Sequence, residues 1–261
     1  MKSTRDSQKN TGETFTVGLF VDGAREGTKK ALIKKEYVAS RGSFLVFNDA
    51  EAIAAIDSHF MSEVYAIVPD VSRYVRDMTK FGPVKMGMLK LRSLGVLELI
   101  KLGARHVWDV RAVLKQDMVK VLPILVHLDY LELKKVHPTK MFLHYQMTDL
   151  ALANNNRALI ACYLGLKKRY SHCELGLMTK NLTLLEEKLR EWDLYAPSVL
   201  APFQSTGYGM RTSQKKCEGL VKVPLRQYVA YTYATAARKM GEVAYLKKIG
   251  IKKAFVCLRE E

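Results

Sequence analysis

Two extended runs open the chain, and the spacing of apolar residues then changes to that of a helix. Residues 14–21 are rich in β-branched and aromatic side chains and stop at Asp22-Gly23, a turn signal that predicts the end of a strand. A second run over residues 43–47 favours another short strand. From Asn48 onwards apolar residues recur every three or four positions, which predicts a helix over residues 50–60.

Most of the remaining chain keeps the helical period. A second helix is expected over residues 71–80, just after Pro69. Because Pro138 disfavours a helical residue before it, residues 136–138 are expected to join two helical halves. We therefore predict a mainly α, two-lobed fold with a short β-prone segment near the N-terminus. Further segments with helical spacing cover residues 107–133, 143–164, 175–192 and 228–248.

The charge of the chain points to a polyanionic partner. Lys and Arg number 42 against 26 Asp and Glu, which gives a formal charge of +16 in a chain that is 48% hydrophobic. In a folded protein such an excess usually marks nucleic acid binding, because each neutralised phosphate releases counterions. No membrane insertion is expected, since no apolar run is long enough to span a bilayer. Without a signal peptide or a CxxC pair, the four cysteines are expected to be reduced thiols in a cytoplasmic protein.

No motif predicts a metal site, a cofactor or a catalytic nucleophile. The six histidines contain no HExxH or HxxxH pattern. There is no GxGxxG or GxxxxGK[ST] motif, and Gly207-Tyr-Gly209 is expected to be a loop. No serine lies in a GxSxG elbow, and no cysteine has a recognisable histidine partner. We therefore expect no cofactor, no metal and no catalytic residue.

Asp22 carries the alternative that would make the chain an enzyme. Metal-dependent nucleases often place a carboxylate at the end of an apolar strand to hold Mg²⁺. Such a site needs further carboxylates at the ends of parallel strands, and the chain shows no alternation of strands and helices after Asp22. Asp70 and Asp109 lie in helical contexts. A plain turn is favoured at Asp22, with the nuclease as an alternative.

Three basic clusters with interleaved aromatic residues are the positive evidence for a function. Basic groups follow a phosphate backbone and aromatic rings stack on bases, which suits a single strand, although any one cluster could equally be a solvated helix face. The first cluster comprises Arg73, Tyr74, Arg76, Lys80, Phe81, Lys85, Lys90 and Arg92. The second is Lys167, Lys168, Arg169 and Tyr170, and the third is Arg211, Lys215, Lys216, Lys222 and Arg226 with Tyr228.

The C-terminal tail is unusually apolar for a chain end. It follows a predicted helix and Gly250. Such groups either pack on their own domain or insert into a neighbouring copy, and the sequence leaves both open. The candidates for self-association are Ile249, Ile251, Phe255 and Val256.

Several short stretches resemble the nucleoproteins of bunyaviruses, of the orthobunyavirus and tospovirus type. In the first half these are Phe44-Leu-Val-Phe-Asn48, the helix over residues 71–80 with Phe81-Gly-Pro-Val-Lys85, and the basic helix over residues 89–96. Residues 141–143, 165–170 and 245–251 are similar to parts of the second half of that family. The first 42 residues depart from it, since they are longer than the usual arm.

The resemblance implies a non-enzymatic viral nucleoprotein that encapsidates single-stranded genomic RNA without sequence specificity. The RNA groove would lie between the lobes, lined by Arg73, Arg76, Lys80, Lys90 and Arg92 and by residues 167–169; residues 211–226 are added from charge alone. Implied partners are RNA, further copies of the chain through its terminal arms, and the viral polymerase, in the virion and host cytoplasm. A basic matrix-type or ribosome-associated structural protein is a further alternative. The expected divisions are an N-terminal arm (1–42), an N-terminal lobe (43–136), a C-terminal lobe (137–240) and a C-terminal arm (241–261).

Overall fold

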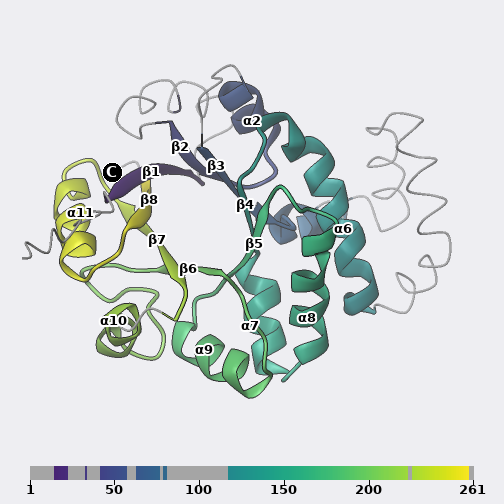
Figure 1. Ribbon diagram of the computed structural model, residues 1–261. Helices are drawn as coiled ribbons and strands as arrows, with labels where there is room; N and C mark the ends of the chain where they lie inside the picture. The colour runs from purple at the N-terminus through teal and green to yellow at the C-terminus, as the bar shows by residue number, and fades with distance from the viewer. Residues whose placement is uncertain are drawn as a thin grey trace, which may run out of the picture.

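The computed structural model contains a closed barrel of eight parallel strands, with helices packed around its outside (Figure 1). It describes residues 15–22, 33, 42–57, 63–76, 79–80, 117–222 and 225–258. The strands are β1 (Thr16–Val21), β2 (Ser43–Val46), β3 (Glu63–Val68), β4 (Lys140–Leu143), β5 (Glu174–Met178), β6 (Ser198–Pro202), β7 (Gln227–Ala234) and β8 (Lys253–Leu258).

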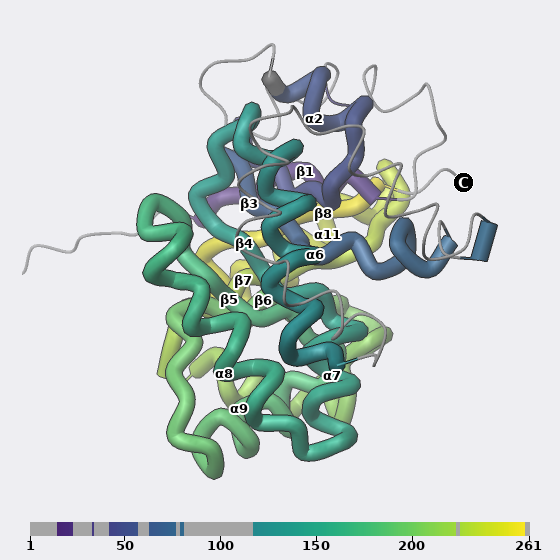
Figure 2. The backbone as a smooth tube through the Cα atoms, turned by 90° about the vertical axis from the view of Figure 1, so that its right-hand side faces the viewer, coloured from purple at the N-terminus to yellow at the C-terminus, as the bar shows by residue number. Residues whose placement is uncertain are grey.

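Helices follow the strands along the chain and cover the outer face of the barrel, as the perpendicular view also shows (Figure 2). Two short 3₁₀ turns, η2 (Lys134–Val136) and η3 (Leu166–Lys168), extend α6 and α8. The helices are α2 (Ala50–Asp57), α6 (Met118–Leu133), α7 (Tyr145–Ala153), α8 (Arg157–Gly165), α9 (Leu182–Glu191), α10 (Gln214–Lys222) and α11 (Lys239–Lys248).

The predicted mainly α, two-lobed fold is wrong. Residues 174–178, at the start of a segment assigned to a helix, are strand β5, and residues 140–143, between the predicted joint and the next helical segment, are strand β4. These strands are buried on both faces, because side chains fill the barrel inside and helices cover it outside. A short strand of this kind is a continuous apolar run without alternation, so it cannot be told from a buried helix by periodicity alone. The C-terminal tail forms β8 and closes the barrel against β1.

The barrel interior is filled by large aromatic side chains opposite small ones. Phe20, Phe142 and Phe255 are buried inside it. A Cβ atom on Gly18 would lie 2.5 Å from the ring of Phe255, and one on Gly176 would lie 2.6 Å from the ring of Phe142. Glycine is therefore needed at both positions, because any side chain would collide with the ring of a neighbouring strand.

Ion pairs close the N-terminal end of the barrel. The ammonium group of Lys253, which is buried, contacts Ser43 and lies 2.5 Å from the carboxylate of Glu63. Burial alone would raise the pKa of Glu63, but the hydrogen bonds from Lys253 and Ser43 outweigh it and lower that pKa. A second pair joins Lys140 and Glu174. The charges at this end are therefore satisfied within the chain.

Replacing Lys253 by Met should lower the free energy of unfolding by about 2 kcal/mol, because Glu63 and Ser43 lose their buried donor. Urea unfolding at neutral pH measures this change. The matched control is Lys188→Met, which removes the pair between Lys188 and Glu191 on the surface of α9. It should change stability by less than about 0.5 kcal/mol. Equal losses in the two variants would contradict the role assigned to Lys253.

Candidate active site

All strands run parallel, so their C-terminal ends meet at one rim of the barrel, where barrel enzymes place their catalytic groups. Side chains alternate between the inside and the outside of a strand. His144 and Lys180 continue the inward-facing rows of Phe142 and Met178, which are buried in the interior. Polar and charged side chains therefore gather at this rim, above an apolar interior.

His144 is a buried and uncharged imidazole at the start of α7. Its Nδ1 accepts the backbone N–H of Gln146 at 3.2 Å, so the proton of the neutral ring is on Nε2. Burial, and then the positive charge of Lys180, lowers the pKa of His144 to about 4. The ring packs against Phe47 and Tyr145, with centroids 5.7 and 4.5 Å away. At neutral pH this histidine is therefore a donor through Nε2–H.

Lys180 lies beside this histidine at the end of β5. Its ammonium group is 3.9 Å from the ring centroid of Tyr145, a cation–π contact. Within the part of the chain that the structure describes, no carboxylate forms an ion pair with the Lys180 side chain. A positive charge thus remains available at the rim.

Tyr231, on β7, places a hydroxyl without a partner under the rim. The residue is 1% exposed, and its buried oxygen has no hydrogen-bond partner among the residues that the structure describes. Burial raises the pKa of this phenol well above its ordinary value, and nearby acidic groups, Asp149 and Asp22 among them, raise it further. The phenol keeps its proton and can donate it in a hydrogen bond. Tyr233, two residues on, donates its hydroxyl to Asp22 at 3.3 Å.

Asp149, on α7, fixes the backbone that carries Lys180. Its carboxylate accepts the hydroxyl of Thr179 at 2.5 Å and the backbone N–H of Lys180 at 3.2 Å. The carbonyl of Lys180 in turn accepts the backbone N–H of Arg211 at 3.3 Å. Burial raises the pKa of Asp149, although these hydrogen bonds and the charges of Arg211 and Lys180 oppose the rise. The β5 and β6 ends of the rim are therefore held together.

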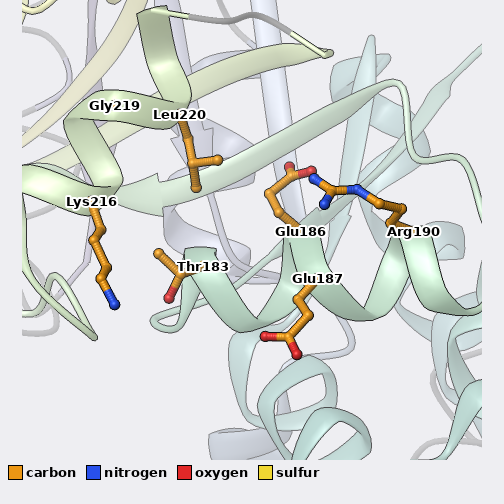
Figure 3. Close-up of a pocket in the computed structure, with 7 residues that line it drawn as sticks. All are labelled: Thr183, Glu186, Glu187, Arg190, Lys216, Gly219 and Leu220. Carbon is orange, nitrogen blue, oxygen red and sulfur yellow. The ribbon is translucent and has the colours of Figure 1, made fainter.

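A groove on the outer surface is a separate feature (Figure 3). It lies between α9 and α10, with Lys216 and Leu220 on one side and Thr183 and Glu187 on the other. Glu186 lies buried beside it and accepts the hydroxyl of Tyr228 at 3.0 Å. The groove is built from outer helices and not from strand ends, so we place the candidate active site at the rim.

The first predicted cluster lies beside β3, and part of it is committed to internal contacts. Arg73 donates to the backbone carbonyl of Asn48 at 2.9 Å and pairs with Glu132 at 3.5 Å. Tyr74 is buried and donates its hydroxyl to Asp129 at 2.8 Å. Arg76 and Lys80 are exposed, whereas Phe81, Lys85, Lys90 and Arg92 lie outside the described residues.

The other predicted basic residues lie at both ends of the barrel. Residues 167–170 precede β5 and Arg226 precedes β7, at the N-terminal end, whereas Arg211 follows β6 at the rim. Tyr170 is buried against Tyr130, while Lys168, Lys215 and Lys216 are exposed. Lys167 donates to the carbonyl of Cys173, Arg169 stacks on Tyr170, and Arg226 pairs with Glu186. The described residues of the three clusters do not gather on one surface, and their contact with RNA stays a prediction.

The residues proposed for self-association are buried in the chain's own barrel. Ile249 and Ile251 are 8% and 3% exposed, and Phe255 and Val256 are at most 1% exposed. Among the described residues no His, Cys, Asp and Glu side chains cluster as a metal site. None of the described helices combines the length and hydropathy needed to cross a bilayer.

The residues at the rim were missed in the sequence because the strands before them were missed. His144 directly follows Met141-Phe-Leu143, and Lys180 comes two residues after Leu175-Gly-Leu-Met178. A polar residue just beyond a short apolar run, repeated along the chain, is the signal that could have found them. Asp22 was placed at the end of a strand from the sequence, but the parallel strands that lie beside that strand were not predicted.

No protein-family model matches the chain, and no curated protein matches it in sequence. Its fold matches the crystal structure of a protein provisionally named 2,5-diketo-D-gluconic acid reductase B, with a TM-score of 0.51 and 12% sequence identity. The match covers 94% of this chain and 77% of that chain. The chain is therefore a parallel eight-stranded barrel protein of the TIM type, and at this identity the likeness shows the fold alone.

The barrel overturns the nucleoprotein prediction. The resemblance implied two helical lobes around an RNA groove, whereas the chain folds as a closed sheet similar to that of a reductase structure. The expectations of a non-enzymatic encapsidation protein and of a virion location are wrong with it, and the nuclease alternative at Asp22 gains no support. RNA, a second copy of the chain and a polymerase stay untested as partners.

Asp149→Asn tests the electrostatics of the rim. Because burial raises the pKa of Asp149 above its ordinary 3.8, the folded state holds this proton more tightly than the unfolded chain. The resulting stability is complete below the unfolded pKa and is lost as the pH rises through the folded pKa. The wild type should therefore lose stability relative to Asp149→Asn as the pH rises above 3.8. Urea unfolding over a pH series that starts below this value measures the difference, and a constant or growing advantage of the wild type would refute it.

Proposed function

We propose that the chain is an enzyme that activates the carbonyl group of a small molecule at the C-terminal rim of the barrel. The observation that carries the proposal is the pair of uncharged donors there, the Nε2–H of His144 and the unpartnered hydroxyl of Tyr231. Tyr145 belongs to the same surroundings, since its ring packs on that of His144 at 4.5 Å and its partly buried side chain packs against the apolar interior that contains Tyr231.

Uncharged, preorganised donors suit a carbonyl oxygen that gains negative charge during the reaction. A buried hydroxyl without a partner costs about 1–3 kcal/mol, so its position at the rim is best explained by a ligand atom that accepts its hydrogen bond. Donors already aimed at a developing oxyanion need no rearrangement in the transition state. The positive charge of Lys180 adds to the same stabilisation.

Two reactions need a carbonyl group polarised in this way: hydride reduction, and proton removal from the adjacent carbon. The structural neighbour is named as a reductase, which favours reduction as the first reaction to test. A reduced nicotinamide dinucleotide would supply the hydride. The residues of this chain would bind the carbonyl compound, polarise its oxygen and exclude water from it.

The test is turnover of a panel of aldehydes, ketones and keto acids by the purified full-length chain. Oxidation of NADPH or NADH reports reduction, and deuterium exchange beside the carbonyl group, followed by NMR, reports proton removal. Activity in either assay supports the proposal. The absence of both activities across the panel, from a protein shown to be folded, would refute it.

His144→Gln should lower kcat/KM on the best carbonyl substrate by about 10²–10³-fold, because the oxyanion loses a preorganised donor. His172→Gln is the matched control, since His172 is exposed before β5, at the opposite end of the barrel. It should leave kcat/KM unchanged. Equal activity of the His144 variant and the wild type would remove His144 from the reaction.

A further inference from the structure

Two basic side chains at the rim, Lys180 and Arg211, form no ion pair with a carboxylate of the described residues. Arg211 lies in the loop between β6 and α10, and its backbone N–H donates to the carbonyl of Lys180, just beyond the end of β5, at 3.3 Å. Asp149 is the acidic group near both, but its carboxylate already accepts the hydroxyl of Thr179 and a backbone N–H. One partly buried carboxylate therefore faces two cations.

The loop that carries Arg211 is held in place from several sides. Ser205, at its start, donates its backbone N–H to the buried carboxylate of Glu242 at 3.0 Å. Gln204 donates to the backbone carbonyl of Tyr233 at 2.9 Å, and Cys217 donates to that of Arg211 at 3.3 Å. The backbone of Arg211 is thus fixed by hydrogen bonds through both its N–H and its carbonyl group. These bonds hold the backbone in place, while the side chain of Arg211 is exposed to solvent.

The hydroxyl of Tyr231, on which the proposed function already rests, lies on the neighbouring strand. Tyr231 pairs with Pro202 at the end of β6, and its backbone carbonyl accepts the N–H of Phe203 at 3.1 Å, where the loop that carries Arg211 begins. A ligand that accepts from this hydroxyl would enter through the same rim as the two cations. The start of α10, at Gln214, directly follows the loop and adds the positive end of a helix dipole.

We infer that the substrate carries a carboxylate or phosphate group as well as its carbonyl group, and that Lys180 and Arg211 bind this anionic group. The inference rests on the proposed function for the carbonyl half of the substrate. Carboxylate and phosphate both present negatively charged oxygens that accept hydrogen bonds from a guanidinium and an ammonium group. Uncharged carbonyl compounds would bind more weakly, because the cations would be left without a counterion.

The experiment separates the anionic group from the carbonyl group by calorimetric titration of the full-length chain. Pyruvate is compared with its neutral methyl ester and with lactate, which lacks the carbonyl group. Dihydroxyacetone phosphate is compared with dihydroxyacetone and with glycerol 3-phosphate. Each ligand is titrated into the wild type, into Arg211→Gln and into Lys222→Gln, whose residue is exposed at the far end of α10 and serves as the charge-matched control.

Arg211→Gln should weaken binding of the anionic carbonyl compounds by about tenfold and leave their neutral counterparts unchanged. Lys222→Gln should match the wild type. A loss for pyruvate alone or for dihydroxyacetone phosphate alone supports the inference and identifies the group as carboxylate or phosphate. Equal binding of anionic and neutral compounds by the wild type, or no effect of Arg211→Gln, would overturn it.

The proposed carbonyl chemistry and the proposed anion site are tested by different pairs of ligands. If the proposed function is wrong but the anion site is right, lactate and glycerol 3-phosphate should bind as tightly as the carbonyl compounds, and Arg211→Gln should weaken all of these anions. If the anion site is wrong, anionic and neutral compounds should bind with equal affinity, whether or not the carbonyl group raises that affinity. Addition of NADPH in a parallel series shows whether Arg211 acts on the dinucleotide, and an effect confined to the dinucleotide would also overturn the inference.

Discussion

Closure of the sheet between β8 and β1 is the constraint on which the rest of the structure depends. Residues 253–256 pair in register with residues 16–19, so the last strand of the chain completes the barrel begun by the first. A closed parallel sheet places every strand end at the same rim. The site combines residues from β1, β4, β5, β6 and β7, and an open sheet would not bring these together. Gly18 and Gly176 leave the room that the buried rings require.

The two ends of the barrel use charge in opposite ways. At the N-terminal end Lys253 and Lys140 are paired with Glu63 and Glu174, so this end contributes to stability and is closed to a ligand. At the rim the carboxylate of Asp149 feels the charges of both Lys180 and Arg211, and the neutral donors of His144 and Tyr231 lie at the same end of the barrel. The ion pairs that stabilise the fold thus lie at the N-terminal end of the barrel, and the candidate active site lies at the C-terminal rim.

Local features could be predicted from the sequence, whereas the arrangement that makes the site could not. The extended runs at residues 14–21 and 43–47 contain β1 and β2, and Asp22 does follow a strand. Strand β5 was hidden at the start of an apolar segment, and β4 just before another, because burial on both faces removes the alternation that marks a strand. The net charge also led to a wrong expectation of one RNA-binding surface. Residues 167–169 and Arg211 belong to basic clusters in the sequence, but they lie at opposite ends of the barrel.

The central claim is that His144 is a neutral donor, and ¹⁵N NMR of histidine-labelled protein tests it most directly. The resonances of His144 are assigned by comparison with His144→Gln and followed as the pH is lowered. The account predicts a proton on Nε2 and none on Nδ1 at neutral pH, with a pKa near 4. A His144 that is an imidazolium at neutral pH, or one that carries its proton on Nδ1, would contradict it.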